Sequence, residues 1–225
     1  VPISFDWTGD FLVVIYLLGL SAFLIALAGM DVGSAFGGFG SSRELSMNAI
    51  TEGTLLFAML PLVLLFRTTN IGAIAVGAYS ISAFVYLPIA LAGLAYLVAL
   101  AVENARIPVD NPTTHLELTM IHEAMILEYS GKRLALIEWA SWNKLLFFIV
   151  LGAHLYLPWG ALSSTSPIAV LYGALYLALN IIAFTVLIAL VESTMAKFRI
   201  FRVPDMIITG LVLGLIATLV VIIIP

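Results

Sequence analysis

The sequence predicts an all-α membrane protein whose chain crosses the bilayer several times. Of its 225 residues, 63% are hydrophobic and only 10% are charged, whereas a soluble domain carries roughly 25% charged residues. The apolar residues form six long runs, and about 20 apolar residues in a helix suffice to span a bilayer. Each run is predicted to be a helix because an isolated strand cannot satisfy its backbone hydrogen bonds in lipid.

The six predicted spans follow one another with short connections, so we treat residues 1–225 as a single membrane domain. The spans are 11–30, 47–66, 84–105, 134–158, 167–194 and 204–224. The stretch 71–83 is also apolar but is shorter and rich in Gly, Ala and Ser. It is either a helix at the membrane interface or the start of a long, tilted third span.

Basic residues divide unequally between the two ends of these spans, which predicts the orientation of the chain. Arg67 lies in a connection on one side, and all other basic residues outside the spans lie on the opposite side. Cytoplasmic loops are rich in Lys and Arg. The predicted cytoplasmic set is Arg43, Arg106, Lys132, Arg133, Lys197, Arg199 and Arg202.

Lys144 lies inside the fourth predicted span, about 15 Å from its start at a helical rise of 1.5 Å per residue. A charge at that depth is costly unless it is paired or hydrated, so it indicates a functional residue. The alternative is a static buried ion pair. Four glutamates also lie within or at the ends of spans, namely Glu52, Glu103, Glu138 and Glu192.

These glutamates have a simpler interpretation as well. A carboxylate near the end of a span can extend to the interface. Glu103 can also pair with Arg106 three residues later on the same helix. Both interpretations stay open on the sequence alone.

Residues 102–133 connect two spans and hold five carboxylates, two histidines and three basic residues. Asn111 can cap a helix that has Pro112 in its first position, and Gly131 can end it. On that predicted helix Glu117 and Glu128 share one face. The opposite face carries His115, Thr119, His122 and Ile126. The helix is apolar over much of its circumference, which predicts that it is buried in protein.

The histidines do not form a recognisable metal site. "HEAMI" lacks the second histidine of the HExxH zinc pair. The chain also has no cysteine, so it cannot supply thiolates to zinc or an iron–sulfur cluster. We therefore expect no metal or cofactor bound by this chain, and structural or proton-passing histidines.

Three stretches resemble one known family. "ENARIPVDNPTTHLELTMIHEAMILEYSG" (103–131) and "DVGSAFGGFGSSRELSMNAITE" (31–52) resemble cytoplasmic segments of the subunit-1 family of respiratory complex I and membrane-bound group 4 nickel–iron hydrogenases. "ESTMAKFRIFRVPD" (192–205) resembles the last cytoplasmic loop of that family. The resemblance is collinear over essentially the whole chain. It implies a fold of eight membrane helices, of which this chain resembles the third to the eighth, with the upstream helices missing.

Within the family the chain resembles the hydrogenase branch, specifically a formate hydrogenlyase subunit 4. The quinone-binding branch typically has glutamates at the positions of Thr113 and His115, and another at that of Ser141. Here Glu138 lies one turn before Ser141 instead, and Lys144 is typical of the hydrogenase branch. These differences disfavour direct quinone binding.

The resemblance implies a coupling subunit that has no catalytic residue of its own. It would anchor a soluble electron-transfer arm and link that arm to proton or sodium translocation in a prokaryotic cytoplasmic membrane. The implied partners are hydrogenase large and small subunits, an iron–sulfur ferredoxin-like subunit, antiporter-like membrane subunits and the lipid bilayer, but no nucleic acid. Iron–sulfur clusters and a nickel–iron site are expected in the partners. The alternatives are a quinone-reductase subunit 1 and a stand-alone ion transporter or channel.

Two groups of candidate site residues follow. The candidate proton relay comprises Glu117, Glu128, Asp110, Glu103, Glu138, Lys144, Glu52 and Glu192. Within it Glu117 and Glu128 are the leading pair, whereas Glu103 and Asp110 can be mainly structural. The candidate contacts to the soluble arm are Arg43, Arg106, His115, His122 and Arg199.

Overall fold

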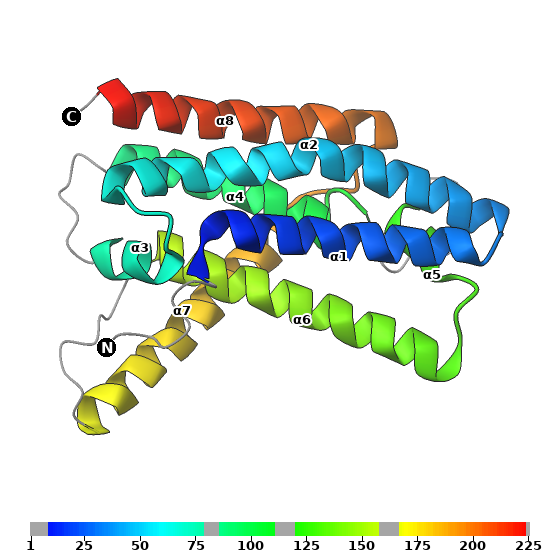
Figure 1. Cartoon of the computed structure of the whole chain (residues 1–225), viewed down its shortest axis with the longest axis horizontal. Coiled ribbons are helices and arrows are strands. Elements are labelled where there is room, and N and C mark those ends of the chain that lie inside the picture. The colour runs from blue at the N-terminus through cyan, green and yellow to red at the C-terminus, as the bar shows by residue number, and fades with distance from the viewer. Residues whose placement is uncertain (1–8, 79–85, 111–119, 158–166, 224–225) are drawn as a thin grey trace.

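The structure of this chain is a computed structural model that describes residues 9–78, 86–110, 120–157 and 167–223. The regular secondary structure within these ranges is helical (Figure 1). In chain order the helices are α1 (Phe11–Asp31), α2 (Ala35–Phe66), α3 (Ile71–Gly77), α4 (Tyr86–Glu103), α5 (His122–Ile126), α6 (Gly131–Tyr156), α7 (Pro167–Thr194), the 3₁₀ turn η4 (Ile200–Arg202) and α8 (Val203–Ile223).

Five of these helices, α1, α2, α6, α7 and α8, are long and apolar enough to cross a membrane. The shorter helix α4 is apolar over Leu87–Glu103, which is near the lower limit for a span. The prediction of a multi-pass all-α protein is thus confirmed. The sequence predicted six spans, and the described residues contain five candidate spans and one shorter apolar helix. The sequence placed the end of the third span at residue 105, but Ala105 adopts a left-handed backbone (φ 49°) that ends α4 earlier.

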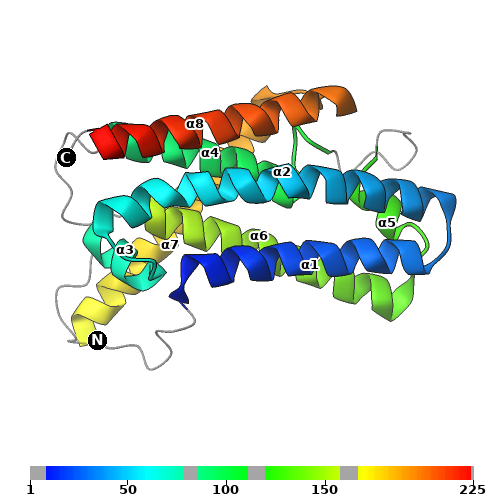
Figure 2. The ribbon, with the colours of Figure 1, turned by 45° about the horizontal axis from the view of Figure 1, so that its top comes forward.

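Helices α1, α2, α4, α6 and α8 run roughly along the long axis of the molecule, while α7 crosses it obliquely (Figures 1 and 2). The turn between α1 and α2, helix α5 and the starts of α6 and α8 gather at one end. We call this the α5 end. Helix α3, the start of α1 and the end of α8 lie toward the other end. Most of the predicted cytoplasmic basic residues belong to the α5 end, and Arg67 caps α2 at the opposite end.

Helix α2 begins well before the predicted span at 47. Ser34 accepts a hydrogen bond from the backbone N–H of Gly37 at 3.0 Å, which caps the helix. The 32 residues of α2 reach about 48 Å, whereas the hydrocarbon core of a bilayer is about 30 Å thick. Residues 35–46, which the sequence placed in a loop, are therefore helical, and Arg43 lies on α2.

The prediction of one long helix between residues 112 and 130 is wrong for residues 120–130, which the structure describes. Met120 and Ile121 are not helical, and α5 covers only His122–Ile126. Gly131, which was expected to end that helix, has φ 57° and begins α6. A glycine with positive φ suits both roles, so the sequence did not distinguish the end of one helix from the start of the next. Residues 111–119 lie outside the described ranges.

The apolar stretch after α2 forms a separate short helix, α3, and is not the start of α4. Asn70 caps α3 by accepting from the N–H of Ala73 at 2.9 Å, and Ala78 ends it. Residues 79–85 lie outside the described ranges.

The largest apolar core of the described residues runs from the middle of the bundle, at Tyr96 of α4, to Ile74 of α3. The Tyr96 ring packs against Phe148 and Tyr156 of α6 and Phe184 of α7, with ring centroids 5.2–6.4 Å apart. Its hydroxyl donates to the Phe148 carbonyl at 2.8 Å. The buried aromatic ring thus joins three helices and also satisfies its own polar group.

Helix α8 packs against α2 and α4 through two glycines spaced four residues apart. A Cβ added at Gly210 would lie 2.8 Å from Val98, and one at Gly214 would lie 2.8 Å from the backbone of Phe57. Thr54 of α2 also donates to the Ile207 carbonyl of α8 at 3.2 Å. Small residues at this spacing allow membrane helices to approach closely.

We expect Gly214→Leu to destabilise the chain by about 1–3 kcal/mol, because the added side chain meets the Phe57 backbone and not a movable side chain. Thermal unfolding of the protein in detergent micelles measures the effect. Gly38→Ala is the matched control, since a Cβ there meets nothing within 4 Å. A helical Gly→Ala change in open space is neutral or stabilises by up to about 1 kcal/mol. Equal melting temperatures for both variants would contradict the tight α2–α8 contact.

Candidate functional site

A cavity of about 340 Å³ lies toward the α5 end, where α1, α2, α4, α5 and α6 meet. Its walls contain eight titratable groups. These groups are Glu44, Glu103, Arg106, Asp110, His122, Glu123, Glu138 and Lys144. Ala22 and Ile25 of α1 add an apolar side. The cavity therefore brings together titratable groups that lie up to 100 positions apart in the sequence, from Glu44 to Lys144.

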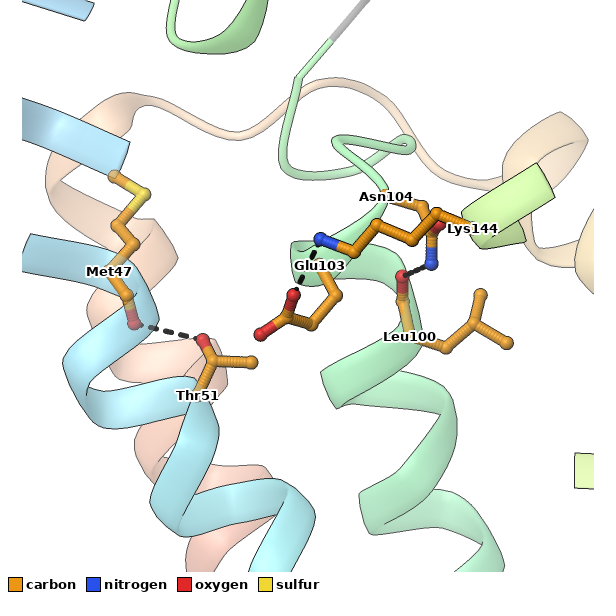
Figure 3. A network of polar contacts seen from close by, with 6 residues as sticks. All are labelled: Met47, Thr51, Leu100, Glu103, Asn104 and Lys144. Carbon is orange, nitrogen blue, oxygen red and sulfur yellow. Dashed lines mark hydrogen bonds and ion pairs between the residues drawn. The ribbon is translucent and has the colours of Figure 1, made fainter. Parts of the chain in front are cut away.

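Glu103 and Lys144 form a buried ion pair at this cavity. The Lys144 Nζ lies 2.7 Å from Oε2 of Glu103, and the two side chains are 12% and 1% exposed. Figure 3 shows the Glu103 carboxylate between α4 and α2, facing Thr51, with Lys144 reaching it from α6. A buried ion pair was the alternative to a functional role for Lys144, and the structure shows such a pair, while the functional role stays a prediction. Removing one partner of such a pair leaves an uncompensated buried charge and typically costs about 3–5 kcal/mol.

The end of α4 directs Glu103 and Arg106 toward different partners. After Glu103 the chain turns through Ala105, and the N–H of Arg106 donates to the Ala101 carbonyl at 2.8 Å. Arg106 then lies 3.9 Å from the carboxylate of Glu192 and 5.7 Å from the ring centre of Trp142. The suggested pair between Glu103 and Arg106 is therefore wrong, because the helix ends between them.

Asp110 anchors α5. One carboxylate oxygen accepts hydrogen bonds from the N–H groups of Ile121 and His122 at 3.0 and 3.2 Å. The other lies 3.2 Å from the Nζ of Lys197, and the Asp110 side chain is only 2% exposed. The N–H of Phe198 also donates to the Pro108 carbonyl at 2.8 Å. The connection between α7 and α8 is thereby joined to the start of α5, and Asp110 has the structural role that the sequence allowed for it.

Helix α5 also packs closely against α2. Arg43 donates to the Met120 carbonyl at 3.0 Å. A Cβ on Gly40 would lie 2.8 Å from the Ile121 carbonyl oxygen. Burial, assisted by the Lys144 ammonium, lowers the pKa of His122 below its usual 6.5, so its imidazole is neutral at pH 7. Arg43 and His122 therefore make contacts within the chain, in addition to any role in docking a partner.

The remaining predicted relay residues are spread more widely. Glu138 is exposed on α6 but lines the cavity, and Glu192 pairs with Arg106. Glu52 lies on α2 against Gly19 of α1, where the glycine leaves room for its carboxylate. Glu128 is exposed and lies outside the cavity wall.

One further candidate stands apart from the cavity, and two are not described. Arg199 is exposed near the start of α8. Glu117 and His115 lie outside the described residues. The relay centred on Glu117 and Glu128 therefore stays a prediction, while Glu103, Glu138 and Lys144 do come together.

Glu44 is a buried carboxylate that sequence reasoning missed. It is 7% exposed and lines the same cavity as Glu103. Because α2 begins at Ala35, Glu44, Asn48 and Thr51 lie on one buried face at helical spacing. The Ser34 cap was the signal that could have revealed this. Once residues 35–46 are read as helix, Glu44 continues the face that carries Thr51.

The described ranges contain no group of three or more His, Asp or Glu side chains arranged to hold a metal ion. The titratable groups that line the cavity are carboxylates, an imidazole, a guanidinium and an amine.

A family model described as NADH dehydrogenase matches residues 1–223. The chain is 34% identical over 195 residues to hydrogenase-4 component C of Escherichia coli (strain K12), covering 85% of this chain and 59% of that protein. It is 27% identical over 196 residues to formate hydrogenlyase subunit 4 of the same strain, covering 87% and 63%. The chain thus spans less than two thirds of the length of either relative.

The fold also has a counterpart among solved structures. A chain of the membrane-bound sulfane sulfur reductase (MBS), an archaeal respiratory membrane complex, superposes with a TM-score of 0.78. The match covers 94% of this chain and 69% of the other, at 19% sequence identity. At that identity the likeness shows a shared fold and does not assign an activity.

We expect Asp110→Ala to lower the stability of the protein by about 3 kcal/mol, because it removes a buried ion pair and two charge-assisted hydrogen bonds. Hydrogen exchange at 121–126 should rise with it. Lys197→Met is the matched control, since it removes the ion pair but leaves both backbone hydrogen bonds. Faster exchange of equal size in both variants would show that Asp110 does not hold α5 through its backbone contacts.

Proposed function

This chain belongs to the NADH dehydrogenase family, and from that membership we propose that it is the membrane-anchoring, energy-coupling subunit of a group 4 hydrogenase-like respiratory complex. The relatives named as hydrogenase-4 component C and formate hydrogenlyase subunit 4 support this branch of the family. The observation that carries the proposal is the buried Glu103–Lys144 pair in a carboxylate-lined cavity at one end of a membrane bundle. Charged residues inside membrane segments mark ion and proton pathways.

The proposed partners are those that the family resemblance implies. Hydrogenase large and small subunits and an iron–sulfur subunit would dock at the α5 end, and antiporter-like subunits would lie beside the bundle in a prokaryotic cytoplasmic membrane. The iron–sulfur clusters and the nickel–iron site would belong to those partners. Arg199 is exposed near the start of α8 and is free of the cavity wall, so it suits a docking contact.

The cavity suggests how such a subunit transmits energy. A redox change in a docked arm alters the electric field at the α5 end, and the nearby ion pair responds because buried charges are weakly screened. Glu103 and Lys144 can then change proton occupancy or position. Glu138 lines the same cavity and is exposed on α6, and Glu52 lies further along α2. These residues form the proposed route into the membrane.

The alternatives predict different behaviour of the purified protein. A quinone-reductase subunit would bind a quinone near residues 102–133 and its complex would reduce quinone. A stand-alone transporter or channel would move ions when this chain alone is placed in liposomes. Ion transport by the isolated chain would contradict the proposed coupling role.

We expect Lys144→Met and Glu103→Gln, each in the assembled complex, to lower ion pumping roughly tenfold, equivalent to about 1.4 kcal/mol. Electron transfer should stay within about twofold, because this chain supplies no redox centre in the proposal. Membrane vesicles with a pH-sensitive or sodium-sensitive dye report pumping, and turnover of the electron donor is followed in parallel.

Two further variants sharpen that experiment. Asp205→Asn removes an exposed carboxylate outside the cavity and serves as the control. Glu128→Gln decides whether the relay extends beyond the cavity to the pair that the sequence indicates. Full pumping by both cavity variants would rule out the proposed coupling role of this site.

A further inference from the structure

The cavity holds two buried carboxylates beside a single lysine. Glu44 and Glu103 are 7% and 4% exposed, and Lys144 forms its ion pair with Glu103. The lysine is also close enough to act electrostatically on Glu44. Arg106, the other cation in the cavity wall, pairs with Glu192. Within the described ranges Glu44 has no ion pair of its own, so one ammonium serves two carboxylates.

Lys144 lines the same cavity as both carboxylates. Glu44 precedes Thr51 by two turns on the same face of α2, a rise of about 10 Å. Figure 3 shows Glu103 facing Thr51, with the Lys144 ammonium on the side of the carboxylate away from Thr51. The flexible four-carbon stem of a lysine allows its ammonium to change partners by rotamer changes alone.

Asn48 adds an independent observation at the same place. It is 5% exposed and lies one helical turn from Glu44. Both its side-chain nitrogen and its oxygen are buried without a hydrogen-bond partner in the described structure, although the amide is near enough to influence the Glu44 carboxylate. An orphaned buried amide typically costs about 1–3 kcal/mol. An amide can donate to a carboxylate and accept from a carboxylic acid, so it can serve either protonation state.

We propose that Lys144 alternates between Glu103 and Glu44, with the orphaned Asn48 amide available to bind the Glu44 carboxyl group when Lys144 moves to it. In the first state Lys144 pairs with ionised Glu103 while Glu44 is protonated. In the second, Lys144 pairs with ionised Glu44 while Glu103 is protonated. One O–H bond at Glu44 breaks and one at Glu103 forms, the lysine stays charged, and the net charge of the three groups is zero in both states.

Other charged groups also face this trio, and two of them are already paired. Glu52 of α2 is close enough for Glu103 to act on it electrostatically. Asp110 is paired with Lys197, and Arg106 with Glu192. Glu123 and Glu138 line the cavity from α5 and α6, His122 is neutral at pH 7, and α1 contributes only apolar residues. The exchange therefore moves one proton between two fixed positions. It rests on the proposed function, since an energy-coupling subunit needs such a two-state element.

The test uses Glu44→Gln and Asn48→Leu in the assembled complex, beside Lys144→Met and the conservative variant Glu44→Asp. We expect Glu44→Gln to keep assembly and electron transfer but to lower pumping roughly tenfold, with partial recovery in Glu44→Asp. Redox-induced infrared difference spectra should lose a carboxylic acid C=O band in Glu44→Gln. Asn48→Leu should assemble at least as well as the unaltered protein, since it removes an orphaned amide, and yet pump less.

The outcomes separate this inference from the proposed function. Normal pumping by Glu44→Gln together with failure of Lys144→Met overturns the two-position lysine and leaves the coupling role intact. Normal pumping by both variants overturns both. Loss of assembly in Glu44→Gln, or an unchanged carboxylic acid band, assigns Glu44 a structural role and also overturns the inference. Normal pumping by Asn48→Leu would show that Asn48 takes no part in the exchange. Because the proposal includes Asn48, that result also overturns it.

Discussion

Burial of charge at the α5 end is the constraint on which the rest of this structure depends. A buried ion is tolerated only when a partner and hydrogen bonds offset its lost hydration. Each principal ion pair here joins separate elements: Glu103 of α4 with Lys144 of α6, Asp110 with Lys197 after α7, and Arg106 with Glu192 of α7. The helices at this end are thus fixed relative to one another by charge, whereas apolar packing around Tyr96 holds the middle of the bundle.

The helices of this chain are held in place in two different ways. In lipid, apolar helices gain little from mutual contact, so close approach at glycines and specific polar contacts must define their packing. The α2–α8 contact at Gly210 and Gly214 uses the first device. The α5 end uses the second, with Asp110 and Arg43 fixing a helix of only five residues. Helix α5 is too short to be stable by itself, so its position depends on those contacts.

The sequence predicted the parts of this molecule that depend on local pattern. Apolar runs indicated the spans, and Lys144 stood out because a charge in a span is costly anywhere. The partners of the charged residues could not be predicted, because they depend on how helices far apart in the sequence pack. Glu103 pairs with a residue 41 positions away and not with Arg106. The left-handed backbone at Ala105 ends α4 before Arg106, so Arg106 does not lie one helical turn from Glu103. Glu44 was missed for a related reason, since an early start of α2 turns an apparent loop residue into part of a buried face.

A static ion pair is the simplest alternative account of Lys144, and the surroundings of the lysine argue against it. A static pair requires one carboxylate, and replacing such a pair by apolar residues is often neutral or stabilising. The cavity instead contains a second buried carboxylate, Glu44, and an orphaned amide, Asn48, one turn away. Neither residue contributes to holding Glu103 and Lys144 together. Groups that are costly to bury and unnecessary for one state are expected where a site must stabilise two states in turn.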